Sequence, residues 1–369
     1  MKKFCVLAIC MVITACLLCG CGTNPGGGGF GKSEFASGSG TESDPYVIDK
    51  AYQWNNISKH LDAYYKLDED LNLGDYSLAP IGSDMEPFTG YLDGQNHKVF
   101  GATISGRGKS GLFGVVSGAT IKNLKFSDSQ VTLIDYEDGD GLGSFVGQAK
   151  TGATIENCHV SSVNVKYNCG DWDDHYIGGF AGKVSSAAEL IYCSSNVIIS
   201  TNSSGKTYYP NFYLGGLVGS VNGGNIKLCW AAGTVDTTKG ASSSYAAMAI
   251  GGIVGVFSGG SITDVYSECN FVGTPRHSGT IGYYSSNASF VEYGFSFCEF
   301  SSTPSKTYYT MKIEANGYTA YYYGPSIIAS SNSILDSEEW ANRPWWKKGK
   351  IHPVFVSYEE YLELENAED

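Results

Sequence analysis

The sequence contains little charge and very little arginine. Charged residues make up 17% of the 369 residues, and only three of them are arginine, at Arg107, Arg276 and Arg343. The formal net charge is −13 at pH 7. Nucleic-acid binding needs clustered positive charge to neutralise phosphates, so this composition argues against a nucleic-acid partner. Disorder along the whole chain is also excluded, because 42% of the residues are hydrophobic and can bury a core.

Several common catalytic and metal-binding patterns are missing as well. The six His residues form no HxH or HExxH pattern. The sequence has no Gly-x-Ser-x-Gly elbow followed by a suitably spaced Asp and His. These absences favour a binding or structural protein over an enzyme.

The first residues have the parts of a secretory signal. Lys2 and Lys3 precede an apolar run from Phe4 to Leu18, and this order is typical of exported proteins. The run spans only 15 residues, which is short for an uncleaved membrane anchor. We therefore expect residues 1–20 to be a signal peptide.

The end of this signal resembles the lipobox of bacterial lipoproteins, in which a Cys after the cleavage site is diacylated. Two frames fit, one ending at Cys16 and one at Cys21. Cys21 is preferred because it leaves a full apolar region and is followed by residues 21–44, a Gly- and Ser-rich stretch typical of flexible tethers. The prediction is a protein exposed at the bacterial cell surface and held to the envelope membrane through lipid on Cys21.

The body of the chain is a repeat. Gly-x-x-Gly units with mostly apolar middles recur at spacings of 27 to 37 residues, two of them degenerate: Gly111–Gly114, Ser144–Gly147, Gly179–Gly182, Gly216–Gly219, Gly252–Gly255 and Gly279–Gly282. Seven or eight residues after each unit comes a second signature, such as Ile121-Lys-Asn-Leu124 or Ile155-Glu-Asn-Cys158. A short β-rich segment follows. Such units bury their apolar side only by stacking on neighbours.

Short strands separated by Gly, Ser and Asn, at one turn of chain per repeat, predict an all-β fold. We expect a parallel β-helix, a solenoid like that of pectin lyases. The paired glycines suit its corners, because glycine permits both a positive φ and a close backbone approach.

Six cysteines lie beyond the signal region, and three of them share one repeat position. Cys158, Cys193 and Cys229 occupy the place that Leu124 and Val265 fill in other repeats. A position that accepts Leu, Val or Cys is an inward apolar position. Reduced core thiols are therefore favoured, with a disulfide as the alternative. Metal binding is disfavoured, since no CxxC or His pair accompanies these residues.

The repeats resemble those of GLUG-motif proteins of bacterial surfaces. The resemblance lies in Gly111-Leu-Phe-Gly114 and Gly216-Leu-Val-Gly219, in an opening segment at residues 40–48, and in a first coil that includes Phe88–His97. It implies a solenoid on a secreted or anchored surface protein, often adhesin-like. The motif carries no defined catalytic residues.

Both ends of the solenoid need covering. Asp49–Leu61, with Asp49 as N-cap, predicts a short capping helix at the N-terminal end. The repeat region is expected to span residues 45–335. Residues 336–369 are expected to form an aromatic cap that closes the last coil, with Trp345 and Trp346, followed by a solvated acidic helix or tail.

The loops just before the Gly pairs carry the candidate binding residues. They are rich in carboxylates and aromatic rings, which stacked coils would place side by side: Asp171, Trp172, Asp173, Asp174, Tyr176, Tyr208, Tyr209 and Tyr213. Aromatic faces suit sugar rings. Oxygen ligands from Asp138, Asp140, Asp171 and Asp173 suggest a weak Ca²⁺ site; otherwise no cofactor is expected.

Three functions remain open. The favoured one is a non-catalytic binding or adhesion scaffold for glycan or protein ligands. The alternatives are a structural envelope protein and a polysaccharide lyase or hydrolase, because β-helices also host such enzymes and Asp171 and Asp173 could supply a carboxylate pair.

Overall fold

The computed structural model describes residues 33–135, 141–168, 174–202, 211–239, 248–272, 277–284, 290–296, 299–300, 310–315, 318–323, 344–348 and 353–368. Residues 34–369 form one compact unit. The expected signal peptide and Cys21 lie outside the described residues. No helix in the described part of the chain has the length and apolar character needed to cross a membrane.

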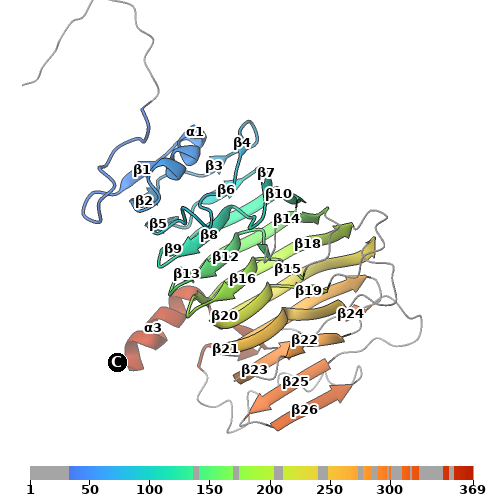
Figure 1. Cartoon of the computed structure of the whole chain (residues 1–369). Helices are drawn as coiled ribbons and strands as arrows, with labels where there is room; N and C mark the ends of the chain where they lie inside the picture. The colour runs from blue at the N-terminus through green and yellow to red at the C-terminus, as the bar shows by residue number, and fades with distance from the viewer. Residues whose placement is uncertain are drawn as a thin grey trace, which may run out of the picture. The chain divides into compact units, whose positions relative to one another are not determined.

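The described strands form a parallel β-solenoid, which confirms the predicted fold class (Figure 1). Each coil pairs in parallel with the next, and five sides can be followed around it. Side 1 begins at the Gly-x-x-Gly motif and contains β8 (Phe113–Ser117), β12 (Val146–Lys150), β16 (Ala181–Ser185) and the start of β20 (Val218–Lys239). Side 2 contains β1 (Tyr46–Ile48), β2 (Tyr64–Leu67), β5 (Tyr91–Asp93), β9 (Thr120–Lys122), β13 (Thr154–Glu156) and β17 (Glu189–Ile191).

The remaining sides continue each coil in chain order. Side 3 contains β3 (Leu71–Asn72), β6 (Lys98–Phe100) and the first parts of β10 (Lys125–Asp135), β14 (His159–Tyr167) and β18 (Ser194–Asn202). Side 4 contains β4 (Ser77–Leu78), β7 (Thr103–Arg107), the second parts of β10, β14 and β18, and β24 (Glu299–Phe300). Side 5 contains β11 (Gly141–Leu142), β15 (His175–Gly178) and β19 (Phe212–Gly215).

Later strands run through several sides. These are β20, β21 (Met248–Val272), β22 (His277–Tyr284) and β23 (Phe290–Ser296). Beyond β24, the described strands β25 (Thr310–Ala315) and β26 (Tyr318–Tyr323) pair antiparallel with each other.

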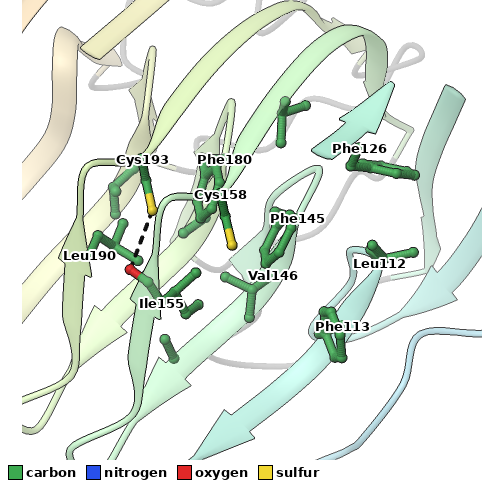
Figure 2. Packing of buried hydrophobic residues seen from close by; sticks show 14 of the residues in the cluster. Leu112, Phe113, Phe126, Phe145, Val146, Ile155, Cys158, Phe180, Leu190 and Cys193 are labelled. Carbon is green, nitrogen blue, oxygen red and sulfur yellow. Dashed lines mark hydrogen bonds between the residues drawn. The ribbon is translucent and has the colours of Figure 1, made fainter. Parts of the chain in front are cut away.

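The apolar middles of the repeat motifs build the core. Phe145 and Val146 are neighbours in sequence and both are fully buried. Figure 2 shows both side chains inside the coil, together with Phe180 from the next repeat. Neighbouring residues of a straight strand face opposite sides, so two inward neighbours mark a corner. The Phe145 and Phe180 rings stack at a centroid distance of 4.7 Å.

Close approach, and not a positive φ, explains the second glycine of each motif. A Cβ on Gly219 would lie 2.4 Å from the backbone of Ile177, and one on Gly182 would lie 2.4 Å from that of Gly141. Neither glycine has a positive φ. Of the two reasons given for glycine at these corners, close backbone approach therefore applies to Gly182 and Gly219, and a positive φ does not. The glycines instead let side 1 of one coil touch side 5 of the preceding coil.

The cysteine prediction is confirmed for the described residues. Cys158, Cys193 and Cys229 are buried thiols that form no disulfide, and Cys269 is buried as well. The Cys193 thiol donates to the carbonyl of Ile155 at 3.3 Å, drawn as the dashed line in Figure 2. Burial raises the pKa of the Cys158 thiol, which keeps it protonated and unreactive. Cys169 and Cys298 lie outside the described residues.

A small helix near the N-terminus is also present, but it is shorter than expected. Helix α1 (Ala51–Trp54) continues as a 3₁₀-helix, η1 (Asn55–Lys59). Lys50, not Asp49, is the N-cap. The Gln53 side chain takes over the capping role, because its Oε1 accepts hydrogen bonds from the backbone N–H groups of Asp49 and Lys50. Trp54 is buried in the core.

The corner between sides 2 and 3 contains a left-handed residue at the same position of successive coils. Their φ values lie between 48° and 62°, at Asn96, Asn123, Asn157, Tyr192, Leu228 and Asp264. Asn adopts this conformation readily, and Asn157 Nδ2 donates to Asn123 Oδ1 at 2.8 Å. Tyr192 and Leu228 carry large side chains in the same strained conformation. This corner therefore changes from an asparagine ladder to bulky residues along the solenoid.

The C-terminal strap, residues 344–348 and 353–368, packs on these bulky residues. It contains β27 (Trp346–Lys348), β28 (Pro353–Phe355) and α3 (Tyr358–Glu368). The Tyr192 hydroxyl donates to the carbonyl of Val356. Trp346 Nε1 donates to Oδ1 of the fully buried Asp264 at 2.7 Å. Leu228 belongs to the same buried cluster.

These contacts differ from the expected closure of the last coil. The strap lies along the flank of several coils, and the Tyr358 hydroxyl donates to Glu156 at 2.7 Å. Helix α3 is not wholly solvated, since Tyr361 is buried.

Candidate binding groove

Three of the predicted binding residues belong to the described chain. Asp174 precedes β15, Tyr176 lies in β15 and Tyr213 lies in β19. The other members lie outside the described residues: Asp171, Trp172, Asp173, Tyr208 and Tyr209, together with the calcium candidates Asp138 and Asp140. In the described part of the chain, no three His, Cys, Asp or Glu side chains gather as a metal site would require.

Strand alternation places Tyr176 and Tyr213 on the outer surface. In β19, Phe212 and Leu214 are buried and Tyr213 between them is half-buried. Parallel pairing joins Tyr176 to Tyr213 directly. Their rings stack with centroids 5.4 Å apart and planes 10° apart. The sequence prediction that stacked coils bring these residues together holds for this pair.

A buried histidine, His175, directly precedes Tyr176 in β15. His175 is 1% exposed, and it is hydrogen-bonded to the hydroxyl of the buried Tyr167 at 2.9 Å. Burial lowers the pKa of His175 to about 4. The imidazole is therefore neutral at pH 7 and packs as part of the core, next to the ring of Phe212.

The Asp174 carboxylate accepts two hydrogen bonds. Its Oδ1 accepts a hydrogen bond from Asn211 Nδ2 at 2.7 Å, which links two successive coils. Its Oδ2 accepts one from the Tyr176 hydroxyl at 3.4 Å. Asp174 thus holds Tyr176 and the neighbouring coil in place.

The tyrosine pair forms one wall of a groove of about 520 Å³. The opposite wall comes from the outward residues of side 1, which are in register along β12, β16 and β20, and includes Gln148, Lys183, Ser185, Ser220 and Asn222. The two walls meet at the second motif glycine, where Gly219 touches the Tyr176–Ile177 backbone. The groove is thus a product of the repeat motif itself.

Lys183 lies beside the tyrosine pair, in space that is open because Gly141 of the preceding coil has no side chain. Gly141 pairs with Tyr176, and a Cβ on Gly141 would lie 3.1 Å from Cγ of Lys183. The lysine stem occupies this space, and its Nζ lies 4.7 Å from the centre of the Tyr176 ring. A cation in this position is attracted to the ring face.

Sequence reasoning had missed the polar wall of side 1. Gln148, Lys183 and Ser220 follow the Gly-x-x-Gly motifs at matching positions, and the half-buried Gln148 and Lys183 alternate with buried residues. That alternation was readable from the sequence. The place where side 1 folds back against side 5 was not, because it depends on the backbone contact at the glycines.

Comparisons with known proteins give a fold but no family. No family model matches the chain. A 143-residue segment, 35% of this chain, is 29% identical to a protein of Evansella cellulosilytica provisionally named a Gly-rich membrane protein, of which it covers 16%. A 170-residue segment is 29% identical to Halomucin of Haloquadratum walsbyi, and covers 41% of this chain and 2% of that protein.

One solved structure covers most of the solenoid. A crystal structure of a Bacteroides ovatus protein, provisionally described as an immunoglobulin A1 protease, aligns with a TM-score of 0.55 over 88% of this chain and 95% of that one. The sequences are 19% identical. The chain is thus similar to this protein in fold, a parallel β-solenoid, and it spans only 16% and 2% of the lengths of the two curated relatives.

Proposed function

We propose that the protein is a non-catalytic surface lipoprotein whose β-solenoid binds carbohydrate in the groove between sides 1 and 5. The observation that carries this proposal is the stacked Tyr176–Tyr213 pair in a groove lined mainly by neutral hydroxyl and amide side chains. Sugar rings present apolar C–H faces and many hydroxyl groups. Aromatic rings and neutral hydrogen-bonding groups complement both.

The direction of the groove suits an extended, repeating ligand. Gln148, Lys183, Ser220 and Val256 lie at one position of four successive coils. Neighbouring parallel strands are about 4.8 Å apart, so equivalent side chains recur at short, regular intervals along the axis. A linear glycan also repeats its hydroxyl groups at regular intervals. One ligand can therefore contact several coils in the same way.

The expected location is the cell envelope. Support comes from the lipobox-like sequence at Cys21 and from the name of the Evansella cellulosilytica relative, which describes a membrane protein. Tethered solenoids expose their lateral surface, which is where the groove lies.

A glycan array probed with the full chain tests the binding role. The groove variant is Tyr176→Ala with Tyr213→Ala. The matched control is Tyr64→Ala with Tyr91→Ala, which removes another stacked pair at the same 5.4 Å centroid distance whose tyrosines do not line this groove. We expect the groove variant to lose binding at least tenfold and the control to bind like the wild type. Equal losses in both variants, or glycan binding by neither the wild type nor the control, would reject the proposal.

Detergent-phase partitioning tests the anchor separately. Cys21→Ser is expected to move the full chain into the aqueous phase, while Cys16→Ser leaves it in the detergent phase. The reverse result would assign the lipid to Cys16.

A further inference from the structure

We infer that the C-terminal strap is an axial tie, which joins four successive coils of the solenoid into one cooperative unit. In a parallel solenoid without such a segment, each coil contacts only its neighbours. The strap adds contacts that link coils which are not neighbours. The inference concerns the opening of the coils, and it stands whether or not the groove binds carbohydrate.

Helix α3 matches the spacing of the coils. Glu156, Ile191 and Lys227 occupy one position of three successive coils, so the first and the last are two strand spacings, about 10 Å, apart. Tyr358 and Glu365 are seven residues apart on one face of the helix, a rise of about 10.5 Å. The Tyr358 hydroxyl donates to Glu156 at 2.7 Å, and Glu365 accepts from the Lys227 ammonium. The helix therefore follows the solenoid axis.

The strap also holds the coil between these two and the coil that follows them. In the middle coil, the ring of Tyr192 stacks on that of Tyr361 with centroids 5.8 Å apart. In the following coil, buried Asp264 accepts the hydrogen bond of Trp346. The strap thus contacts the coils that contain β13, β17, β20 and β21.

The same four coils line the groove. Their side 1 supplies Gln148, Lys183, Ser220 and Val256 to one groove wall. The strap contacts them at the corner between sides 2 and 3. The spacing of the groove residues depends on the coils staying paired. A segment that opposes the separation of these coils therefore preserves the shape of the groove.

Strain at the corner makes the tied coils depend on the strap together. Tyr192 and Leu228 have φ values of 53° and 55°, which bulky residues keep only where the surrounding structure holds them. Opening of any tied coil removes an anchor of the strap, and the corners of the other coils then lose their cover. With neighbour contacts alone, β21 can open from the end nearer to it while β13 stays closed.

Native-state hydrogen exchange of the full chain, measured by mass spectrometry on peptides from β21, tests the tie. Low concentrations of denaturant are needed, because they favour joint opening of large units over local fluctuations within one coil. Ile155→Val and Ile121→Val remove the same carbon from two fully buried residues of one column. Ile155 lies in a tied coil, and Ile121 lies in the coil before it. We expect Ile155→Val to speed exchange in β21 about twofold to tenfold, and Ile121→Val to leave it unchanged.

The Tyr358→Phe background separates the tie from neighbour contacts. This change removes the hydrogen bond to Glu156, so Ile155→Val should then speed exchange in β13 and no longer in β21. Unchanged β21 exchange in Ile155→Val alone would overturn the inference. So would a β21 effect that persists in the Tyr358→Phe background, or an equal β21 effect of Ile121→Val, since neighbour contacts would then carry the coupling. No ligand is present, so the result is independent of the glycan array.

Discussion

Two outer columns of aromatic side chains on the same solenoid have different surroundings. At the corner between sides 2 and 3, Trp230 and Tyr266 stack with planes 5° apart, and the strap covers Tyr266 with Trp346 and Phe355. At the groove, Tyr176 and Tyr213 stack in a similar way and line a volume of about 520 Å³. Stacking alone therefore does not identify a binding face. A parallel β-solenoid aligns any aromatic residue that recurs at an outward position.

The two columns differ in which part of the chain surrounds the aromatic rings. At the corner, the strap supplies rings and hydrogen bonds for residues such as Leu228 and Asp264 that a bare solenoid surface would leave exposed. At the groove, the described neighbours are mainly polar side chains of the solenoid itself. We therefore expect the corner aromatics to contribute mainly to stability and the groove aromatics mainly to binding.

The largest stability effect is expected at the centre of the strap. Trp346→Ala removes a buried ring and the N–H donor to buried Asp264, and should lower the free energy of unfolding by about 3–5 kcal/mol. Denaturant unfolding measures this change. Leu362→Ala, on the exposed part of the same strap, is the control and should cost less than about 0.5 kcal/mol. Similar costs for both changes would mean that the strap does not stabilise the corner.

The next effect is a loss of stability in acid. Burial lowers the pKa of His175, under the groove, and of His159, near the corner, to about 4 from the usual 6.5. The unfolded chain therefore binds protons more readily than the folded chain between these values. The stabilisation is complete above pH 6.5 and is lost as the pH falls towards 4, by up to about 3 kcal/mol per histidine.

Unfolding free energies measured from pH 7 to pH 4.5 test this prediction. His175→Gln and His159→Gln should each flatten the profile, and the double variant should flatten it most. A double variant with the wild-type slope would contradict the buried, neutral state of both residues.

A smaller loss of stability is expected at Gly219, where the groove walls meet. Gly219→Ala places a Cβ against the Ile177 backbone and should cost about 1–3 kcal/mol through overpacking. It should also weaken glycan binding in the folded fraction, because it pushes side 1 away from the Tyr176 wall. The two quantities can be measured by thermal unfolding and by calorimetry. Unchanged stability would show that the close approach at the motif is not required.

The smallest expected change in the free energy of unfolding is that of Tyr192→Asn, and its sign depends on whether the strap is packed on the corner. Tyr192→Asn relieves left-handed strain and could extend the ladder of Asn123 and Asn157, but it loses the ring contact with Tyr361 and the hydrogen bond to Val356. In the full chain we expect a loss of about 1 kcal/mol. In a Trp346→Ala background we expect the loss to shrink or become a gain. Equal effects in both backgrounds would argue against coupling between corner and strap.

The sequence predicted the parts of the fold that depend on local repetition. The recurring Gly-x-x-Gly units predicted the stacked coils, and the shared position of Cys158 with Leu124 predicted a buried thiol. The strap could not be predicted in this way, because its contact between Tyr358 and Glu156 joins residues 202 positions apart. One signal was present: Tyr192 and Leu228 interrupt a position that holds Asn in earlier repeats.

The candidate site was predicted only in part for a similar reason. Tyr176 and Tyr213 were found because the loops before the Gly pairs share one place in each repeat. Lys183 was not, because its position depends on the empty space above Gly141 in the preceding coil. Spacing along the chain shows which residues share a column, but not which columns fold towards each other.

Hydrogen–deuterium exchange of the full chain with the glycan that binds most tightly on the array tests the assignment of the two columns most directly. The account predicts slower exchange on ligand addition in β15, β16 and β19, around Tyr176, Lys183 and Tyr213, with no change at Tyr192 or in α3. Protection confined to the corner and the strap, with the groove strands unchanged, would contradict it.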